Sequence, residues 1–278
     1  MTPRELIRRT AERFLAAGIP DPENDSALLL SHLTGQSALS LRLDSDTVLD
    51  DTLVASYSEF VTMRLKRVPL QYILGEAPFY GRLFKVDPRV LIPRPETALL
   101  CEWALEILQS ISAPRVLDLC CGSGCIGLTV MAERPDAQVT LSDLSEDALS
   151  ISAVNAVRFS LDADIRHSDL FESLTGSSFD LVISNPPYIP SCECSRLQPE
   201  VLHEPRLALD GGSDGCDLYR RIISGVHSVL VPGGRLLMEI GINEAGSLVP
   251  LLSENGFVSI DLRKDYAGID RMILATLP

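Results

Sequence analysis

From Arg115 onward the chain alternates between short apolar strands and helical segments, and this alternation constrains the fold more than any other feature. Such alternation is typical of a mostly parallel sheet that is covered by helices. Strands are predicted near residues 115–119, 137–142, 162–166, 179–184, 234–240, 257–262 and 271–276. Helices are predicted near residues 123–133, 145–158, 215–229 and 243–254. The sequence therefore predicts an α/β fold with a seven-stranded, mostly parallel sheet.

Residues 1–75 differ from the rest of the chain because they show helical periodicity alone. Helices are predicted from about Thr2 to Phe14, from Asp21 onward, and from about Asp50 to Lys66. Their apolar stripes are explained by a small helical core, and no catalytic constellation occurs among them. From its position ahead of the α/β part, we expect residues 1–75 to form a helical substrate-docking domain.

A β-hairpin linker is predicted over residues 76–93. Phe79–Val86 alternates as a strand, Asp87-Pro88-Arg89 is a turn, and Val90–Ile92 is a second short strand. The α/β domain then occupies residues 94–278. Within that domain, a long segment rich in proline, glycine and charge, from Pro190 to Asp214, is predicted to be a loop over the site.

The segment Asn185-Pro186-Pro187-Tyr188 follows an apolar run that is predicted to be a buried strand. Neither proline can donate to a sheet ladder, so the strand stops abruptly on a stiff segment. The Asn185 side-chain oxygen and the Pro186 carbonyl are acceptors that can hold a planar NH2 group, and Tyr188 adds a flat aromatic face. The alternative is an ordinary turn with a structural asparagine, because Asn-Pro is a common turn signal.

A strand, a glycine loop and a helix start follow one another between Val116 and Gly127. The loop formally matches the dinucleotide pattern Gly-x-Gly-x-x-Gly, which is a weak signal by itself. Three carboxylates favour a different ligand. Asp118 can meet a ligand cation, Asp143 closes the next strand where it can accept from ribose hydroxyls, and Asp169 can approach an adenine amino group. A nucleoside that carries a cationic amino acid, S-adenosyl-L-methionine, fits this ordered set better than a dinucleotide.

The amino-acid composition argues against two classes of partner, nucleic acids and membranes. The formal net charge of −14 argues against a broad phosphate-binding surface, so we expect no direct nucleic acid binding. No apolar run approaches the roughly 18 residues of a membrane span, and the N-terminus has no signal-peptide core, so we expect a cytoplasmic protein without membrane contact.

The chain has seven cysteines, and an odd number favours reduced thiols. Cys192, Cys194 and Cys216 are grouped but lack a fourth ligand, so no metal site is predicted.

Further motifs make a family resemblance specific. They are Leu91-Ile92-Pro93-Arg94-Pro95-Glu96-Thr97, Glu204-Pro205-Arg206-x-Ala208-Leu209-Asp210-Gly211-Gly212, Pro232-Gly233-Gly234-x-x-x-x-Glu239-Ile240-Gly241 and Asp265-x-x-Gly268-x-Asp270-Arg271. Together with the glycine loop and Asn185–Tyr188, they resemble the release-factor glutamine methyltransferase family over essentially the whole chain. The resemblance implies a Rossmann-like class I methyltransferase domain behind a small helical bundle and a hairpin linker.

What the resemblance implies is N5-methylation of the glutamine in the Gly-Gly-Gln motif of class I peptide chain release factors, with S-adenosyl-L-homocysteine as product. Asn185 and Pro186 would be catalytic, and the glutamine would be held by Asn185, Pro186, Pro187 and Tyr188. The predicted cofactor-binding residues are Asp118, Cys120, Cys121, Gly122, Ser123, Gly124, Asp143, Asp169, Leu170 and Asn185. One position departs from the family pattern, because Cys120 stands where the family usually has glycine.

Three other functions remain open at this stage. A ribosomal-protein glutamine methyltransferase would share the chemistry, although Arg94-Pro95-Glu96-Thr97 favours the release-factor branch. A DNA adenine or cytosine amino-methyltransferase would also use Asn-Pro-Pro-Tyr, but the acidic charge and the lack of a basic recognition region argue against it. A non-catalytic regulator that only senses the cofactor is disfavoured by the intact Asn185 segment.

Overall fold

The computed structural model describes residues 1–278, which form two compact units. The first unit is Met1–Glu76 together with Gln198–His203. The second unit is Ala77–Leu197 together with Glu204–Pro278. The sequence placed residues 198–203 in the α/β domain, whereas in the structure they pack with the helical unit.

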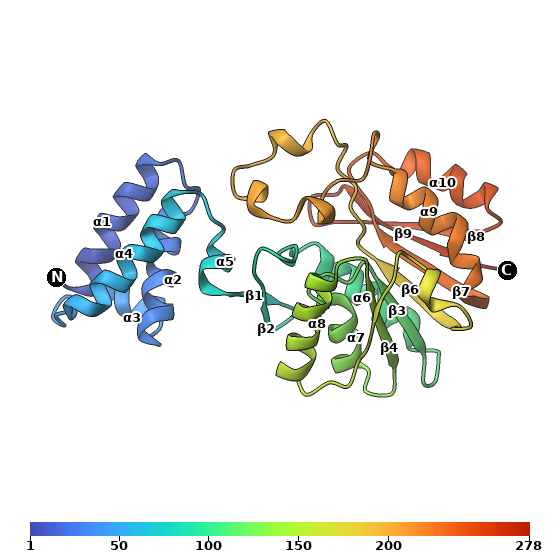
Figure 1. Ribbon diagram of the computed structural model, residues 1–278, viewed down its shortest axis with the longest axis horizontal. Helices are drawn as coiled ribbons and strands as arrows, with labels where there is room; N and C mark the ends of the chain where they lie inside the picture. The colour runs from blue at the N-terminus through green and yellow to red at the C-terminus, as the bar shows by residue number, and fades with distance from the viewer. The chain divides into compact units, whose positions relative to one another are not determined.

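The first unit contains only helices, in agreement with its periodicity (Figure 1). They are α1 (Pro3–Ala16), α2 (Pro22–Thr34), α3 (Ala38–Leu43), α4 (Asp51–Leu65) and α5 (Leu70–Leu74). Thr2 and Asp50 cap α1 and α4 by accepting hydrogen bonds from backbone amides three residues on. Phe14, Leu30 and Tyr57 are among the fully buried residues of its core. The sequence missed α3 and α5, which are too short to show a clear period.

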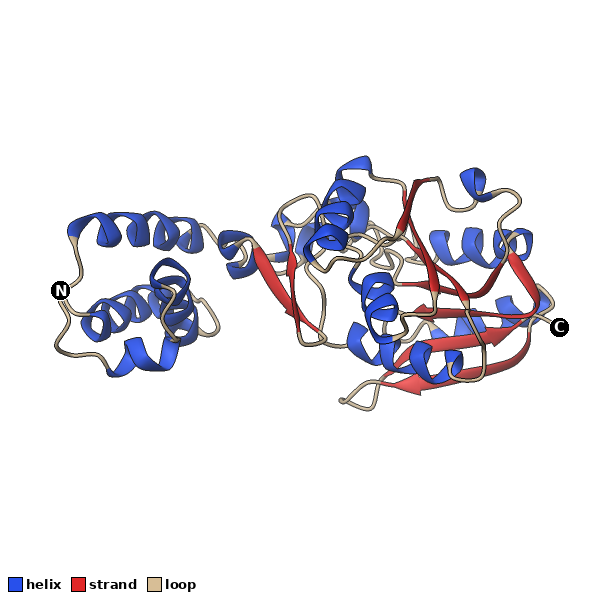
Figure 2. Ribbon diagram, turned by 90° about the horizontal axis from the view of Figure 1, so that it is seen from below, coloured by secondary structure: helices blue, strands red, loops and turns tan.

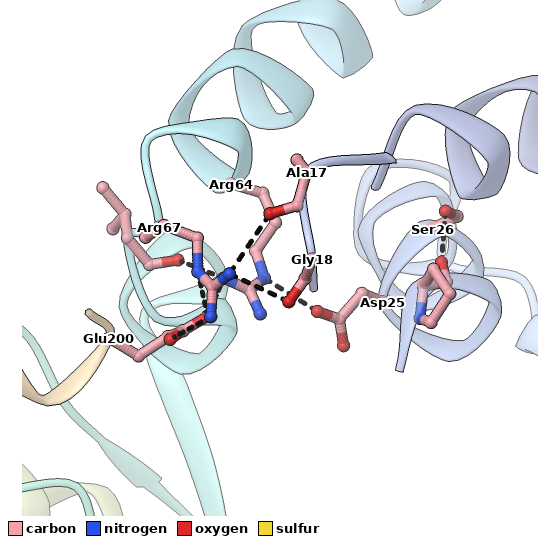
Figure 3. Close-up of polar contacts among 9 residues, drawn as sticks. Ala17, Gly18, Asp25, Ser26, Arg64, Arg67 and Glu200 are labelled. Carbon is pink, nitrogen blue, oxygen red and sulfur yellow. Dashed lines mark hydrogen bonds and ion pairs between the residues drawn. The ribbon is translucent and has the colours of Figure 1, made fainter. Parts of the chain in front are cut away.

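A buried ion-pair network attaches residues 198–203 to this unit (Figure 3). Arg64 donates from Nε to Asp25 Oδ2 at 2.7 Å and from Nη1 to Glu200 Oε1 at 2.8 Å. Arg67 donates from Nε to the same Glu200 oxygen at 2.7 Å and from Nη2 to Oε2 at 2.8 Å. Because the Arg64 side chain is only 5% exposed, its charge depends on these two carboxylates for compensation.

The predicted hairpin is present, but its turn lies elsewhere. Its strands are β1 (Glu76–Phe79) and β2 (Arg82–Lys85), drawn in Figure 2 as a pair separate from the large sheet. Tyr80 and Gly81 have φ angles of 47° and 73°, the conformation that a two-residue hairpin turn requires. Residues 90–92 form no strand, so the predicted second strand was wrong. The predicted turn at residues 87–89 is present, since the Val90 amide donates to the Asp87 carbonyl at 3.1 Å, but it does not join the two hairpin strands. The alternation of residues 79–86 concealed a break that only the left-handed Tyr80-Gly81 pair creates.

The second unit is built on the predicted seven-stranded sheet. Its strands are β3 (Arg115–Leu119), β4 (Gln138–Asp143), β5 (Asp164–His167), β6 (Phe179–Ser184), β7 (Leu230–Glu239), β8 (Val258–Lys264) and β9 (Asp270–Thr276). The strand order is β5-β4-β3-β6-β7-β9-β8, and only β9 pairs antiparallel with its neighbours. The fold prediction is therefore confirmed, with each strand within four residues of its predicted bounds.

Helices cover both faces of the sheet (Figures 1 and 2). One core packs under α6 (Thr97–Leu108), α7 (Cys125–Glu133) and α8 (Glu146–Arg158). The other core packs under α9 (Asp217–Gly225) and α10 (Ala245–Glu254). Neighbouring strand residues alternate between these cores, as when Val116 faces the first core and Leu117 the second. Both faces of the central strands β3 and β6 are therefore buried, and the carboxyl ends of the strands remain free to form the site.

Candidate active site

The candidate site lies at the carboxyl ends of β3, β4 and β6. Leu119 pairs with Ser142 on one side and with Ser184 on the other, so the loops after these strands begin side by side. The strand order reverses at this point, which is where open α/β sheets bind ligands. A cavity opens here, and of the predicted site residues it is lined by Cys120, Cys121, Gly122, Ser123, Asp143, Asp169, Leu170, Asn185 and Pro187.

The glycine loop turns away from β3 through left-handed backbone. Cys120, Gly122 and Gly124 have φ angles of 61°, 54° and 76°. A Cβ at Gly122 would meet no atom within 4 Å, so the cavity approaches bare backbone at that residue. Cys120, by contrast, carries a side chain in a conformation that favours glycine. The departure from the family pattern thus falls on a position where glycine would relieve strain.

Asp118 lies beneath this loop and does not line the cavity. Its side chain is fully buried, and Oδ2 accepts from the Gly127 amide at 2.8 Å while Oδ1 has no partner. Burial raises the pKa of Asp118 to about 7, although the Gly127 amide opposes the shift. A Cβ on Gly127 would lie 2.2 Å from Leu141 Cδ2 and 2.9 Å from Asp118 Cβ. The observed role of Asp118 is to fix the start of α7, and its contact with a ligand cation stays a prediction.

Asp143 holds the loop from the neighbouring strand and faces the cavity. Its Oδ2 accepts from the Gly122 amide at 2.9 Å, and its Oδ1 accepts from the Ser145 amide at 2.9 Å. Burial raises the pKa of Asp143, and these amides oppose the shift. Each carboxylate oxygen accepts more than one hydrogen bond, so Asp143 can also receive hydroxyl donors from a ligand.

Asp169 and Leu170 reach the cavity from the loop after β5. Leu170 has a φ angle of 50°, which turns the chain sharply after Asp169. Asp169 Oδ1 pairs with Arg221 Nη2 of α9 at 2.8 Å. A ligand amino group at Asp169 would therefore share this carboxylate with Arg221.

Asn185 follows directly on β6 and is half-buried at the cavity wall. Ser184 before it is anchored, because its Oγ donates to the Leu119 carbonyl at 2.7 Å. The Asn185 Nδ2 donates to Thr97 Oγ1 at 3.3 Å. Asn185, the predicted acceptor, and the predicted cofactor loop therefore follow paired residues, Ser184 and Leu119, of two adjacent strands.

Tyr188 and Pro186 lie further from the cavity than the sequence suggested, since neither lines it. The Tyr188 hydroxyl accepts from Arg271 Nη2 at 2.8 Å and donates to Glu239 Oε1 at 3.4 Å. The Arg271 guanidinium also lies 5.3 Å from the centre of the tyrosine ring. One tyrosine face is therefore occupied by the protein, and stacking of a substrate on Tyr188 stays a prediction.

The loop from Pro190 to Asp214 contributes Pro205, Leu207, Ala208 and Asp210 to the cavity wall. It is fastened to the Asn185 segment, because Ile189 donates to the Leu209 carbonyl and accepts from the Gly211 amide. A Cβ on Gly211 would lie 2.7 Å from Tyr188 Cα. This close approach explains why the loop needs glycine there.

Sequence reasoning assigned no role to four residues that lie around the site. Thr97 Oγ1 donates to Glu239 Oε2 at 2.7 Å, and both side chains are buried. Glu204 accepts from the Ile92 amide at 3.0 Å and from Arg94 Nη2 at 2.6 Å. Thr97, Glu204, Glu239 and Arg271 all belong to the motifs that carried the family resemblance, and this was the available signal.

The described residues contain no group of three or more His, Cys, Asp or Glu that could hold a metal ion. Cys192, Cys194 and Cys216 are free thiols, and Cys192 is exposed. What the site offers is hydrogen-bond acceptors and backbone amides around a cavity.

Two family models match the chain. A model described as Methyltransferase small domain matches residues 97–246, which is more than half of the chain. A model described as PrmC N-terminal domain matches residues 5–75. The two matches fall on the α/β part and on the helical part, respectively.

Relatives of known name match over nearly the full length. A release factor glutamine methyltransferase from Clostridium acetobutylicum is 40% identical over 256 residues, which cover 90% of this chain and 90% of that protein. Another, from Deinococcus radiodurans, is 38% identical over 272 residues, which cover 98% and 97%. A solved 16S rRNA methyltransferase from T. thermophilus, in complex with AdoMet and guanosine, has a TM-score of 0.54 at 22% identity. It covers 73% of this chain and 50% of that chain, and it shows likeness of fold alone.

Proposed function

This chain belongs to the release factor glutamine methyltransferase family, and from that premise we propose the reaction of its site. It transfers a methyl group from S-adenosyl-L-methionine to the side-chain amide nitrogen, N5, of the glutamine in the Gly-Gly-Gln motif of class I peptide chain release factors. S-adenosyl-L-homocysteine is the second product. The substrate follows the names of the relatives, and the chemistry is supported by the site.

The observation that carries the proposal is the position of Asn185. Its amide follows β6, while the glycine loop follows the adjacent strand β3, and Leu119 pairs with Ser184 between them. A cofactor on the loop and an amide held by Asn185 would therefore meet in one cavity. The site presents a planar acceptor for a planar nitrogen group, which suits an amide better than a hydroxyl or a thiol.

The residues present fit the proposed cofactor. Gly122 leaves open space at the cavity, Asp143 has acceptor capacity beyond its two amide partners, and Asp169 and Leu170 line the wall beyond it. The buried Asp118 Oδ1 without a partner adds an acceptor beneath the loop. When bound, S-adenosyl-L-methionine supplies an activated methyl group on a sulfonium centre.

The task of the protein is then orientation. An amide nitrogen is a poor nucleophile because its lone pair is delocalised, so its approach must be well aligned. Asn185 Oδ1 accepts one N–H of the glutamine amide, and the Pro186 carbonyl is proposed as the second acceptor. Positioning of this kind supplies roughly 7–11 kcal/mol of a barrier. The same acceptors stabilise the positive charge that the nitrogen gains when the N–C bond forms, before it loses its proton to water.

The helical unit is proposed to dock the release factor, since a separate all-helical unit precedes the catalytic one. None of the helices combines the length and the apolar character needed to cross a membrane. The cytoplasmic location and the absence of direct nucleic acid binding stay predictions of the sequence.

The test is transfer of labelled methyl from S-adenosyl-L-methionine to a purified class I release factor. A release factor with the Gly-Gly-Gln glutamine substituted, duplex DNA and ribosomal proteins are assayed beside it. We expect label on the intact release factor alone. Label on DNA or on a ribosomal protein instead, or equal label on the substituted factor, would refute the proposed substrate.

A further inference from the structure

The side chain of Asn185 can serve a substrate amide in only one of its two orientations. A carboxamide has an oxygen that accepts and a nitrogen that donates, at nearly the same distance from the chain. To hold an N–H of glutamine, Asn185 must present Oδ1 to the cavity and keep Nδ2 away from it. Some feature of the protein must select this orientation, and the residues behind Asn185 provide one.

The selection begins at Thr97, the first residue of α6. Its hydroxyl carries a single proton, and Oγ1 donates that proton to Glu239 Oε2 at 2.7 Å. Only lone pairs of Oγ1 are then left for Asn185, whose Nδ2 lies 3.3 Å away. If the Asn185 amide were turned over, two acceptor oxygens would face each other with no proton between them. Thr97 therefore accepts only the NH2 end of Asn185.

The direction of the Thr97 hydroxyl depends in turn on Glu239. Arg271 Nη2 lies 3.2 Å from Glu239 Oε1, and the Tyr188 hydroxyl donates to the same oxygen at 3.4 Å. Burial raises the pKa of Glu239, and the Thr97 hydroxyl and the Arg271 cation oppose the shift. A carboxylate beside a cation accepts on both oxygens, so Thr97 has to donate.

We propose that Thr97 and Glu239 are positioning residues for the methyl transfer, forming a one-way hydrogen-bond relay that turns Asn185 Oδ1 toward the substrate amide. This inference rests on the proposed function of Asn185. Both side chains are buried, at 2% and 1% exposure; Thr97 lines the cavity and Glu239 lies behind it. The relay joins α6, β6 and β7, three elements that no local sequence pattern brings together.

Glu239→Gln tests the relay with almost no change of shape. Arg271 has donors only, so it will bind the oxygen of the new amide and leave the NH2 facing Thr97. Thr97 would then accept from Gln and donate to Asn185, which reverses the relay and turns the Asn185 amide over. We expect kcat for release-factor methylation to fall about 100-fold, with KM for the factor and the affinity for S-adenosyl-L-homocysteine within about twofold of wild type.

Thr97→Val and Thr97→Ser separate the hydroxyl from the packing of the side chain. Valine keeps the shape but removes the hydroxyl, and we expect a loss of kcat comparable to that of Glu239→Gln. Serine keeps the hydroxyl and should restore kcat to within about threefold of wild type. Thr129→Val is the matched control, because Thr129 is fully buried in α7 and its hydroxyl has no partner. Equal impairment of Thr97→Ser and Thr97→Val, or full activity of Glu239→Gln, would overturn the relay.

A second readout does not depend on turnover. The chain has five asparagines, so selective ¹⁵N labelling gives few side-chain NH2 signals, and Asn185→Asp identifies the one from Asn185. We expect Glu239→Gln to shift that signal by removing its acceptor, and Thr129→Val to leave it in place. An unmoved signal would refute the relay even if the variant were inactive. A moved signal with no methylation of release factors by the wild type would keep the relay and reject the proposed substrate.

Discussion

Replacing Glu200 by glutamine tests how strongly residues 198–203 are held by the helical unit. Glu200 accepts from Arg64 at 2.8 Å and from Arg67 at 2.7 Å and 2.8 Å. A glutamine has one acceptor oxygen, and its NH2 would face a guanidinium that can only donate. The buried Arg64 charge would then be compensated by Asp25 alone.

The free energy that Glu200→Gln is expected to remove follows from the pKa of Glu200. Burial by itself would raise this pKa, but hydrogen bonds from Arg67 and Arg64 lower it from 4.5 to about 2. A carboxyl with that shift contributes roughly 3 kcal/mol to folding at neutral pH, which corresponds to about a 100-fold change in the opening equilibrium. Because Glu200 is only 17% exposed, solvent screening reduces this figure little.

The sign of the pH dependence is fixed by the lowered pKa. The contribution of Glu200 is fully present above its unfolded pKa of about 4.5 and is lost as the pH falls toward 2. Asp25 has the opposite effect on the pH dependence of stability, since burial raises its pKa despite the opposing hydrogen bond from Arg64. Asp25 is common to both proteins, so we expect the difference between wild type and Glu200→Gln to be constant near neutral pH and to shrink below about pH 4.5.

Hydrogen exchange followed by mass spectrometry is the suitable assay, because the single tryptophan, Trp103, lies in α6 of the other unit. Protection factors for peptides from α4 and from residues 198–203 should fall about 100-fold in Glu200→Gln at pH 7. Glu12→Gln is the control, since Glu12 forms an exposed pair with Arg8 and should change protection little. Unchanged protection in Glu200→Gln, or a difference that grows toward acidic pH, would refute this reasoning.

Further predictions concern four residues in the site or beneath it. Asn185→Ala should lower kcat for methyl transfer by 100-fold or more with cofactor affinity nearly unchanged, whereas Asp143→Ala should mainly weaken cofactor binding; calorimetry and steady-state kinetics separate the two. Cys120→Gly should raise the free energy of unfolding by about half a kcal/mol, because relief of left-handed backbone strain outweighs the conformational entropy that glycine loses on folding. A Tm below that of the wild type in thermal unfolding would contradict this. Gly127→Ala should cost about 1–3 kcal/mol, since its Cβ would overlap Leu141, and a wild-type midpoint in urea would argue against it.

The fold could be predicted because local sequence patterns indicate most of its strands and helices. The strands from β3 to β6 lie within two residues of prediction. β3 and β6 are short, largely apolar runs and β4 alternates apolar and polar residues, whereas β5, Asp164-Ile165-Arg166-His167, contains a single apolar residue. The strand β7 starts at Leu230 rather than at residue 234. The prediction started it too late because Pro232 and Gly233 indicated a turn, whereas both lie within the strand, opposite a register shift in β6. The hairpin turn was misplaced for a related reason, as the left-handed Tyr80-Gly81 pair interrupts an otherwise continuous alternation.

The candidate site was predicted only where a residue stands next to a strand end. Asn185, Asp143 and the glycine loop could be placed because the carboxyl ends of parallel strands meet at one edge, and the structure puts all three at one cavity. Asp118 and Tyr188 were placed at the right strands, but their side chains point to Gly127 and Glu239. Backbone order is readable from periodicity, whereas the direction of a side chain depends on partners that are distant in sequence.

The sequence by itself determined the order of strands and helices, the glycine loop after β3 and the abrupt end of β6, because these follow from backbone preferences of neighbouring residues. Tertiary structure alone decided two other features. It brought Thr97 within reach of Asn185 and Glu239, and it placed Glu200 between Arg64 and Arg67. These contacts join residues 88 to 142 positions apart, and a buried charge or hydroxyl acquires a direction only when such distant partners compensate it.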